Sequence, residues 1–223
     1  MIRAALLDLD GTLLDTAPDL AQAGNQTLAE LGLRELPDSQ VRDFIGQGIA
    51  ALVRRCLEAS GGRVPDDALF ESALTRFAVH YERVNGNSSV PYPGVREGLA
   101  AMRAGGLRLA CVTNKAARFA VPLLAARALD EYFDAVVTSD QAGSRKPSPG
   151  PFLVACERLG VSPEEAAAIG DSANDAQGAR AAGCAPVLLV PYGYREGRDI
   201  RGIECDGIVG SLFEAADVLL NRS

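Results

Sequence analysis

The sequence has no hydrophobic run that approaches the length of a membrane span, and its first residues, MIRAALLDLDG, lack the layout of a signal peptide. It also has no internal repeat and no low-complexity segment. Its five cysteines are an odd number, are widely spaced and form no CxxC pair. Such cysteines are typical of reduced core thiols, so we expect a cytoplasmic protein that does not act on a membrane.

Positive charge is also scarce. The chain has 22 basic against 29 acidic side chains, a net charge of −7, which argues against nucleic acid or an acidic membrane surface as a partner. Its single histidine, His80, lies beside a predicted apolar helix face, and we interpret it as structural. A hydrolase of the Ser-His-Asp type is therefore disfavoured.

What the sequence does contain is a regular alternation of strand-like and helix-like segments. The 223 residues, nearly half of them apolar, suffice for one large domain or for a domain with an insert. Strands are predicted at 4–9, 107–113, 135–139, 167–170, 186–191 and 207–209. Because these runs are apolar on both faces and alternate with helices, they indicate an α/β fold with a Rossmann-like, doubly wound parallel sheet.

One long interval contains no predicted strand. Between residue 15 and about residue 85, three helical apolar stripes follow one another, with a break at Gly46-Gln47-Gly48. The segment NGNSSVPYPG, rich in proline and glycine, leads back to the sheet. We predict a helical cap domain of residues 15–90, inserted into a catalytic core of residues 1–14 and 91–223. Open α/β sheets bind ligands outside the carboxyl ends of their strands, so this insert is expected to form a lid there.

Polar side chains lie at or just after the ends of four of the predicted strands. They are Asp8 and Asp10, followed by Gly11 where the chain can turn, then Thr113 and Asn114, then Lys146 in SRKPSPGP, and finally Asp171, Ser172 and Asp175. The carboxyl ends of these strands converge on one crevice of a doubly wound sheet. We therefore expect the side chains to lie together.

These residue types suit phosphoryl transfer. A carboxylate can attack phosphorus and form an acyl phosphate. Several oxygen ligands with net negative charge suit Mg²⁺, which together with a lysine stabilises phosphoryl oxygens. An anionic substrate would then be neutralised locally, by the metal and Lys146, in spite of the negative charge of the chain.

Each residue also has an ordinary structural explanation. Asp8 and Asp10 can be turn acids, Asp175 can be a solvated acid, and Lys146 can be a surface lysine. The polar pairs Thr113-Asn114 and Asp171-Ser172 can cap helices. The functional interpretation rests on their combination. The segment Gly46-Gln47-Gly48 is explained equally well by a helix break and by a turn that faces the substrate.

The segments DLDGT, VTN, RKPSP and GDSAND, in this order and at these separations, resemble the four motifs of the haloacid dehalogenase superfamily of phosphohydrolases. Within it, DLDGTLLDTAPDL, FIGQGI, YPGVREGLAAM, VTNKAARFAVPLL and VPYGY are most similar to the phosphoglycolate phosphatases. The resemblance implies that Asp8 is the nucleophile and Asp10 the general acid and then base, and that Thr113 and Lys146 bind the phosphoryl group. It also implies Mg²⁺ held by Asp8, by the backbone carbonyl of Asp10 and by Asp171, with Ser172 and Asp175 in support.

We therefore expect a Mg²⁺-dependent phosphatase of a small phosphorylated metabolite, with 2-phosphoglycolate as the leading substrate and an aspartyl phosphate as intermediate. Substrate binding is assigned to Gly11, Gly46, Gly48, Thr113, Asn114 and Lys146. A related phosphatase or pyrophosphatase for another metabolite is the alternative. A sugar phosphomutase is disfavoured because DTAPDLAQAG lacks the histidine expected after Asp15-Thr16, and a phosphoacceptor signalling domain because it would need no lid.

Overall fold

The computed structural model describes residues 1–61, 64–194, 197 and 199–221. Within these ranges six parallel strands form one sheet in the order β5-β4-β1-β6-β7-β8. The strands are β1 (Ala4–Leu7), β4 (Arg108–Thr113), β5 (Ala135–Thr138), β6 (Ala166–Gly170), β7 (Val187–Leu189) and β8 (Gly207–Ile208). The chain builds the sheet outward from β1 in one direction and then in the other, so the predicted doubly wound α/β fold is confirmed.

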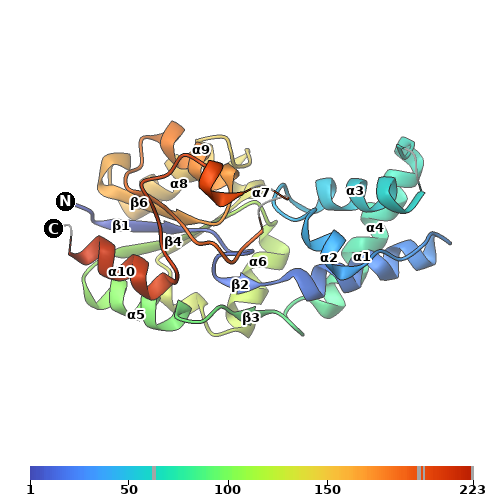
Figure 1. Cartoon of the computed structure of the whole chain (residues 1–223), viewed down its shortest axis with the longest axis horizontal. Coiled ribbons are helices and arrows are strands. Elements are labelled where there is room, and N and C mark those ends of the chain that lie inside the picture. Colours follow the sequence, from blue (N-terminus) through green and yellow to red (C-terminus); the bar gives the residue numbers. More distant parts are fainter. Residues whose placement is uncertain (62–63, 195–196, 198, 222–223) are drawn as a thin grey trace.

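Helices cover both faces of this sheet (Figure 1). One face carries α8 (Gly150–Leu159) and α9 (Ala173–Ala182); the other carries α5 (Val95–Ala104), α6 (Ala117–Ala126) and α10 (Leu212–Leu220), while the short α7 (Ser139–Ala142) follows β5. Successive residues of a strand point to opposite faces. Accordingly Ala4 and Leu6 of β1 join the apolar cluster under α8 and α9, and Ala5 and Leu7 join the one on the other face.

Four further helices form a second body beyond the strand ends, on the side away from both termini (Figure 1). They are α1 (Ala17–Glu30), α2 (Asp38–Arg42), α3 (Ile49–Gly61) and α4 (Asp67–Val84). They enclose a hydrophobic cluster of their own, in which Phe77 and Tyr81 are fully buried and which Phe119 and Tyr194 join from the sheet side. The helical insert is thus present. Its exact division from the core, at residues 15 and 90, stays a prediction, and the separate cluster supports it.

The chain enters and leaves this helical body through two adjacent segments. Two short antiparallel strands, β2 (Leu14–Asp15) and β3 (Val90–Pro91), pair there. Neither strand is predicted from the sequence, because a two-residue strand leaves no periodic pattern to detect. Asp19 of α1, fully buried, accepts backbone hydrogen bonds from Gly86 at 2.9 Å, Ser88 at 2.8 Å and Ser89 at 3.0 Å. The two crossings are therefore tied to each other.

Several predicted element ends are corrected; for example, the strand predicted at 186–191 is β7 at Val187–Leu189. The first strand was expected to continue to Leu9, but β1 ends at Leu7. Asp8 still donates its N–H to the carbonyl of Ile169 at 3.0 Å, and its carboxylate then accepts the N–H of Leu9 at 2.7 Å, where the chain turns away from the sheet. The second helical stripe of the insert was expected to include Phe44 and Ile45, but α2 ends at Arg42 and α3 begins at Ile49.

No helix in the described part of the chain is long and apolar enough to cross a membrane. The five cysteines are free, and four of them are buried.

Candidate active site

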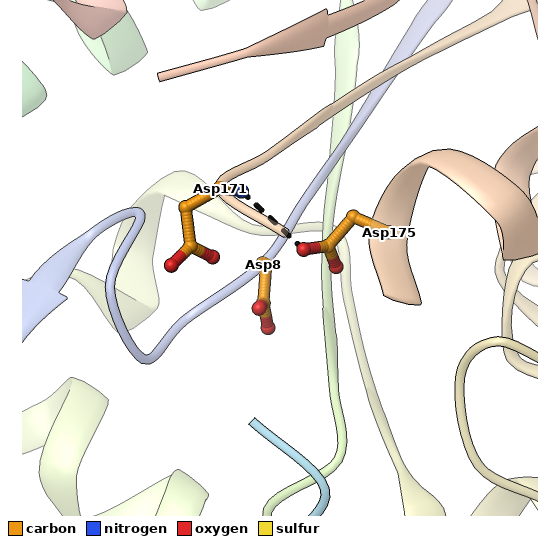
Figure 2. Close-up of side chains that lie close together, drawn as sticks. All are labelled: Asp8, Asp171 and Asp175. Atoms are coloured by element: carbon orange, nitrogen blue, oxygen red, sulfur yellow. Dashed lines mark hydrogen bonds between the residues drawn. The ribbon is translucent and has the colours of Figure 1, made fainter. Parts of the chain in front are cut away.

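Three carboxylates meet where β1 and β6 end (Figure 2). Asp8 follows β1, whereas Asp171 and Asp175 follow β6, and one oxygen from each lies within 4.8 Å of the others. Burial raises the pKa of Asp8 to about 7, an effect that Lys146 opposes and Asp175 reinforces. Burial, followed by the charges of Asp175 and Asp8, also raises the pKa of Asp171 well above its ordinary value. Ionisation of these carboxylates is therefore unfavourable unless a cation binds beside them.

Lys146 supplies the ammonium beside this cluster. It is 3% exposed, and its Nζ lies 2.7 Å from Asp8 Oδ1 and 2.6 Å from Asp175 Oδ1, and donates to the carbonyl of Val112 at 2.8 Å. Burial disfavours the charged form, but the two carboxylates outweigh it and raise the pKa of Lys146. The side chain is thus a buried cation between two acids, and the explanation of Lys146 as a surface lysine is wrong.

Asp175 is likewise buried rather than solvated, with 2% exposure. Its Oδ2 accepts from the N–H of Ser172 at 3.1 Å and from the Ser172 hydroxyl at 2.7 Å. Since Lys146 uses its other oxygen, Asp175 is held by protein donors on both sides. Ser172 begins α9 and at the same time orients Asp175, so its capping role and a supporting role in the site coincide.

Thr113 and Asn114 lie at the end of β4, and both are buried. The Asn114 amide nitrogen donates to the carbonyls of Lys146 at 3.0 Å and of Gly46 at 3.1 Å, and its oxygen accepts the Lys146 N–H at 2.8 Å. Asn114 therefore fixes the lysine loop and connects it to the helical insert. The Thr113 hydroxyl accepts the N–H of Lys115 at 3.1 Å, which leaves its own hydrogen available for a ligand.

Asp10 lies apart from the three-acid cluster. Its Oδ1 accepts from the Thr16 hydroxyl at 2.7 Å, and the Lys115 ammonium lies 2.7 Å from Oδ1 and 3.0 Å from Oδ2. Lys115 is 4% exposed, and it was not among the residues that the sequence analysis selected. Asp8 and Asp10 thus have different environments, one beside the acids and Lys146, the other beside Lys115 and the start of the insert.

A pocket of about 440 Å³, part of it open to solvent, lies between the sheet and the helical insert. The sheet side contributes Asp8, Asp10, Thr113, Asn114 and Lys115, and the insert contributes Leu20, Ile45, Gly46, Gly48, Ile49 and Leu52. The segment Gly46-Gln47-Gly48 therefore faces the crevice through both glycines. The pocket has a polar floor and largely apolar walls.

Gly11 does not line this pocket. It has a φ of +88°, and a Cβ atom there would lie 2.3 Å from an Asp171 oxygen and 3.0 Å from the Tyr194 ring. A side chain at this turn would displace Asp171. The structure thus gives Gly11 a steric reason to be glycine, and its assignment to substrate binding stays a prediction.

Comparison with known proteins places this geometry in a family. Residues 2–183 match the model of the haloacid dehalogenase-like hydrolases. The chain is 51% identical to a phosphoglycolate phosphatase of Nitrosospira multiformis over all of its own length and 97% of that protein. It is 49% identical to one of Thiobacillus denitrificans, over 96% and 94% of the two chains.

The chain belongs to the haloacid dehalogenase-like hydrolases. Its fold matches the crystal structure of a predicted phosphoglycolate phosphatase from Haemophilus somnus with a TM-score of 0.92 and 31% identity, over 98% of each chain. It is an enzyme, a phosphoric monoester hydrolase of this family.

The acid cluster of this hydrolase fits a divalent cation. Three carboxylates share the site with the single ammonium of Lys146, so the group carries an excess of negative charge when all three carboxylates are ionised. Carboxylate oxygens are the ligands that small hard cations prefer. Asp8 and Asp171 would hold the ion, and Asp175, already held by Ser172 and Lys146, would support it from close by.

Proposed function

We propose that this hydrolase converts 2-phosphoglycolate to glycolate and inorganic phosphate in the cytoplasm, in a Mg²⁺-dependent reaction with a phosphorylated Asp8 as intermediate. The substrate is inferred from the full-length similarity to phosphoglycolate phosphatases. One observation carries the mechanism. Among the described residues, only Asp8 combines three properties: it lines the pocket, it contacts Lys146, and it belongs to the acid cluster.

In the first step, an Asp8 oxygen attacks the phosphorus of the substrate, and the bond between phosphorus and the ester oxygen breaks. Asp10 lines the same pocket and gives its proton to the departing glycolate oxygen. Lys146 and Thr113 lie beside Asp8 and donate to the phosphoryl oxygens as charge moves onto them. When bound, Mg²⁺ supplies further positive charge to these oxygens.

In the second step, water attacks the phosphorus of the phosphorylated Asp8. Asp10, now deprotonated, takes the proton of that water, and the acyl phosphate bond breaks. Inorganic phosphate leaves, and the Asp8 carboxylate is restored. The same residue thus serves as acid in the first step and as base in the second, because the proton that it gives to the leaving group is replaced by one from water.

The helical insert sets the size of the substrate. Leu20, Ile45, Ile49 and Leu52 close the pocket with apolar side chains, which leave little polar surface for a large sugar phosphate. A short ester fits such walls and needs few polar contacts beyond its phosphate and carboxylate. The backbone N–H groups of the Gly46-Gln47-Gly48 turn are proposed to approach that carboxylate.

The test is hydrolysis of a panel of phosphorylated metabolites by the purified chain, with and without Mg²⁺. Phosphoglycolate should give the highest kcat/KM, and chelation of the metal should abolish turnover. Asp8→Asn should lose activity while its Tm stays close to that of the wild type, because an amide has nearly the same shape but does not attack phosphorus. The exposed Asp130→Asn is the matched control and should remain active.

Substantial hydrolysis by Asp8→Asn after metal repletion would remove Asp8 from the role of nucleophile. A wild-type preference for another ester would refute phosphoglycolate as the substrate and leave the phosphatase mechanism intact.

A further inference from the structure

Lysine is rare in this chain. Its 223 residues contain only Lys115 and Lys146, and the remaining 20 basic residues are arginines. Both lysines are buried, with 4% and 3% exposure, and both contact carboxylates of the active site. A buried ammonium is costly unless partners compensate it. Lys146 has a role in the proposed reaction, whereas Lys115 has none so far.

The two ammonium groups differ in how completely they are satisfied. Lys146 contacts three separate acceptors, Asp8, Asp175 and the carbonyl of Val112. Within the described residues, the hydrogen bonds of the Lys115 ammonium go to one carboxylate, that of Asp10. Since an ammonium has three donors, Lys115 retains capacity for one more acceptor.

Lys115 also has a distinct position. Of the eleven residues that line the pocket, it is the one with a positive charge, and it shares the floor with two carboxylates. Without it, a second anionic group on a substrate would find no positive charge in the pocket lining, only carboxylates, neutral polar groups and apolar walls. Lys115 is therefore the lining residue whose charge attracts a carboxylate of the substrate.

The helical insert holds Lys115 in this position from behind. Its Nζ lies 5.0 Å from the centroid of the Tyr81 ring, close enough for a cation–π contact. Tyr81 of α4 is fully buried, and its hydroxyl has no hydrogen-bond partner within the described residues. Tyr81 thus lies beside the Lys115 ammonium but outside the pocket lining, and it supports the lysine from the side of the insert.

The distance to the ester oxygen is short. In the proposed reaction Asp10 contacts the ester oxygen, and Lys115 contacts the same Asp10 carboxyl at 2.7 Å. One further hydrogen bond of about 2.7 Å then separates Asp10 from the ester oxygen. In such a complex the ammonium is at most about two hydrogen-bond lengths from the ester oxygen, so a carboxylate on the carbon next to that oxygen can reach Lys115.

We infer that Lys115 is the specificity-determining residue that binds the carboxylate of the substrate and so selects phosphate esters with a carboxylate next to the ester carbon. This inference rests on the proposed function. The ammonium holds Asp10 in the free enzyme and, with its remaining donor capacity, adds the substrate carboxylate when the pocket fills. Tyr81 is a positioning residue, because it contacts Lys115 and does not line the pocket.

The experiment compares phosphoglycolate with its neutral amide, which has the same ester skeleton without the charge. The wild type should prefer the acid by about 10- to 100-fold in kcat/KM, the range expected for a hydrogen bond to a charged group. Lys115→Met should lower the acid-to-amide ratio toward one. Lys115→Gln, which keeps a donor for Asp10, should lose the preference as well and serves if the methionine variant does not fold.

Arg145→Met is the matched control. Arg145 is an exposed cation whose guanidinium lies close to Gly48, but it does not line the pocket. Its loss should change the acid-to-amide ratio by less than about 3-fold, because an exposed charge is screened by solvent. Competitive inhibition by inorganic phosphate, measured for every variant, verifies that the phosphate site is intact.

The outcomes separate this inference from the proposed function. A wild-type preference for the acid that persists in both Lys115 variants overturns the inference and leaves phosphoglycolate as substrate. Equal rates of the wild type on acid and amide overturn the inference, whereas phosphoglycolate as the substrate is refuted only if the metabolite panel gives a better ester. If the wild type prefers a different carboxylated ester and the Lys115 variants lose that preference, the inference is supported and phosphoglycolate is refuted as the substrate.

Discussion

At the scale of residues, the site is organised by which carboxylate has which partner. Asp8 and Asp171 lie in a buried cluster of acids, whereas Asp10 is held by Lys115 and the Thr16 hydroxyl. Two acids that are two positions apart in the sequence thereby acquire different chemistry. In the proposed reaction the first attacks phosphorus, and the second, which lies toward the insert, protonates the leaving group.

The cluster predicts how metal and pH act together on stability. The pKa of Asp8 rises from 3.8 to about 7 on folding, and that of Asp171 also rises, so between these values the folded protein binds more protons than the unfolded chain. The free energy of unfolding of the metal-free protein should therefore fall as pH rises through this window. Mg²⁺ should offset the loss, so the increase in Tm on adding Mg²⁺ should be larger at about pH 8 than at about pH 5.5.

Thermal unfolding with and without Mg²⁺ at the two pH values measures this effect. Asp171→Asn removes one acid of the cluster and should reduce the increase in Tm at the higher pH. An increase that is the same at both pH values would show that these carboxylates do not bind the ion.

A second prediction concerns Asp10. Asp10→Asn removes the proton for the departing oxygen but leaves the backbone carbonyl unchanged. The defect in kcat should be larger for alkyl phosphates than for p-nitrophenyl phosphate, whose leaving group needs no proton, by at least about 10-fold. Steady-state kinetics on both substrates decide it, and equal losses would argue against the role of Asp10 as an acid.

At the scale of elements, the turn between α2 and α3 determines how the insert meets the sheet. Gly46 and Gly48 line the pocket, and the carbonyl of Gly46 accepts the amide of Asn114 at 3.1 Å. Gly48 has a φ of +85°, and a Cβ atom there would lie 3.4 Å from the carbonyl of Asn114. The turn therefore lies directly against the end of β4, and it has little room for side chains.

Gly48→Ala tests this turn. We expect kcat/KM for phosphoglycolate to fall by about 10-fold and that for p-nitrophenyl phosphate to fall less, because only the first substrate places a carboxylate near the turn. Gly32→Ala is the matched control, since Gly32 also has a positive φ, +69°, but no atom within 4 Å of a new Cβ. It should cost about 1 kcal/mol of stability and leave the kinetics unchanged. Parallel losses for both substrates in Gly48→Ala would make the turn purely structural.

At the scale of the whole molecule, Tyr194 links the acid cluster to the insert. Its backbone N–H donates to Asp171 Oδ2. Its hydroxyl accepts the N–H groups of Thr16 at 2.7 Å and Ala17 at 2.8 Å and donates to Asp15 at 2.6 Å. One buried residue thus connects a predicted metal ligand with the segment through which the chain enters the insert.

Tyr194→Phe should lower the free energy of unfolding by about 1–3 kcal/mol, because two buried N–H groups lose their acceptor. It should also raise KM for phosphoglycolate, since the entry to the insert is less firmly held over the pocket. Urea unfolding and steady-state kinetics measure the two effects. Tyr132→Phe is the control and should change neither quantity, because Tyr132 is a half-buried tyrosine just before β5, outside the insert. A Tyr194→Phe variant with wild-type stability and KM would refute the link.

Most of the fold could be predicted from local patterns. Apolar runs that alternate with helical stripes identify the strands and the insert, because burial on both faces of a parallel sheet selects such runs wherever they occur. Polar residues directly after these runs also identify most of the site, since neighbouring parallel strands end at one edge. Asp8, Lys146, Asp171 and Asp175 are therefore near one another by topology alone.

Other features arise only when distant segments meet. The pairing of Lys115 with Asp10 joins residues 105 positions apart, and it depends on the direction of a long side chain after β4 turns. The pairing of β2 with β3 and the contacts of Tyr194 depend in the same way on where two crossings of the chain lie in space. The sequence by itself determined which chemical groups this protein brings to the sheet edge. Only the tertiary structure decided which acid faces which lysine, because ion pairs and burial are set by distances between segments that no local pattern encodes.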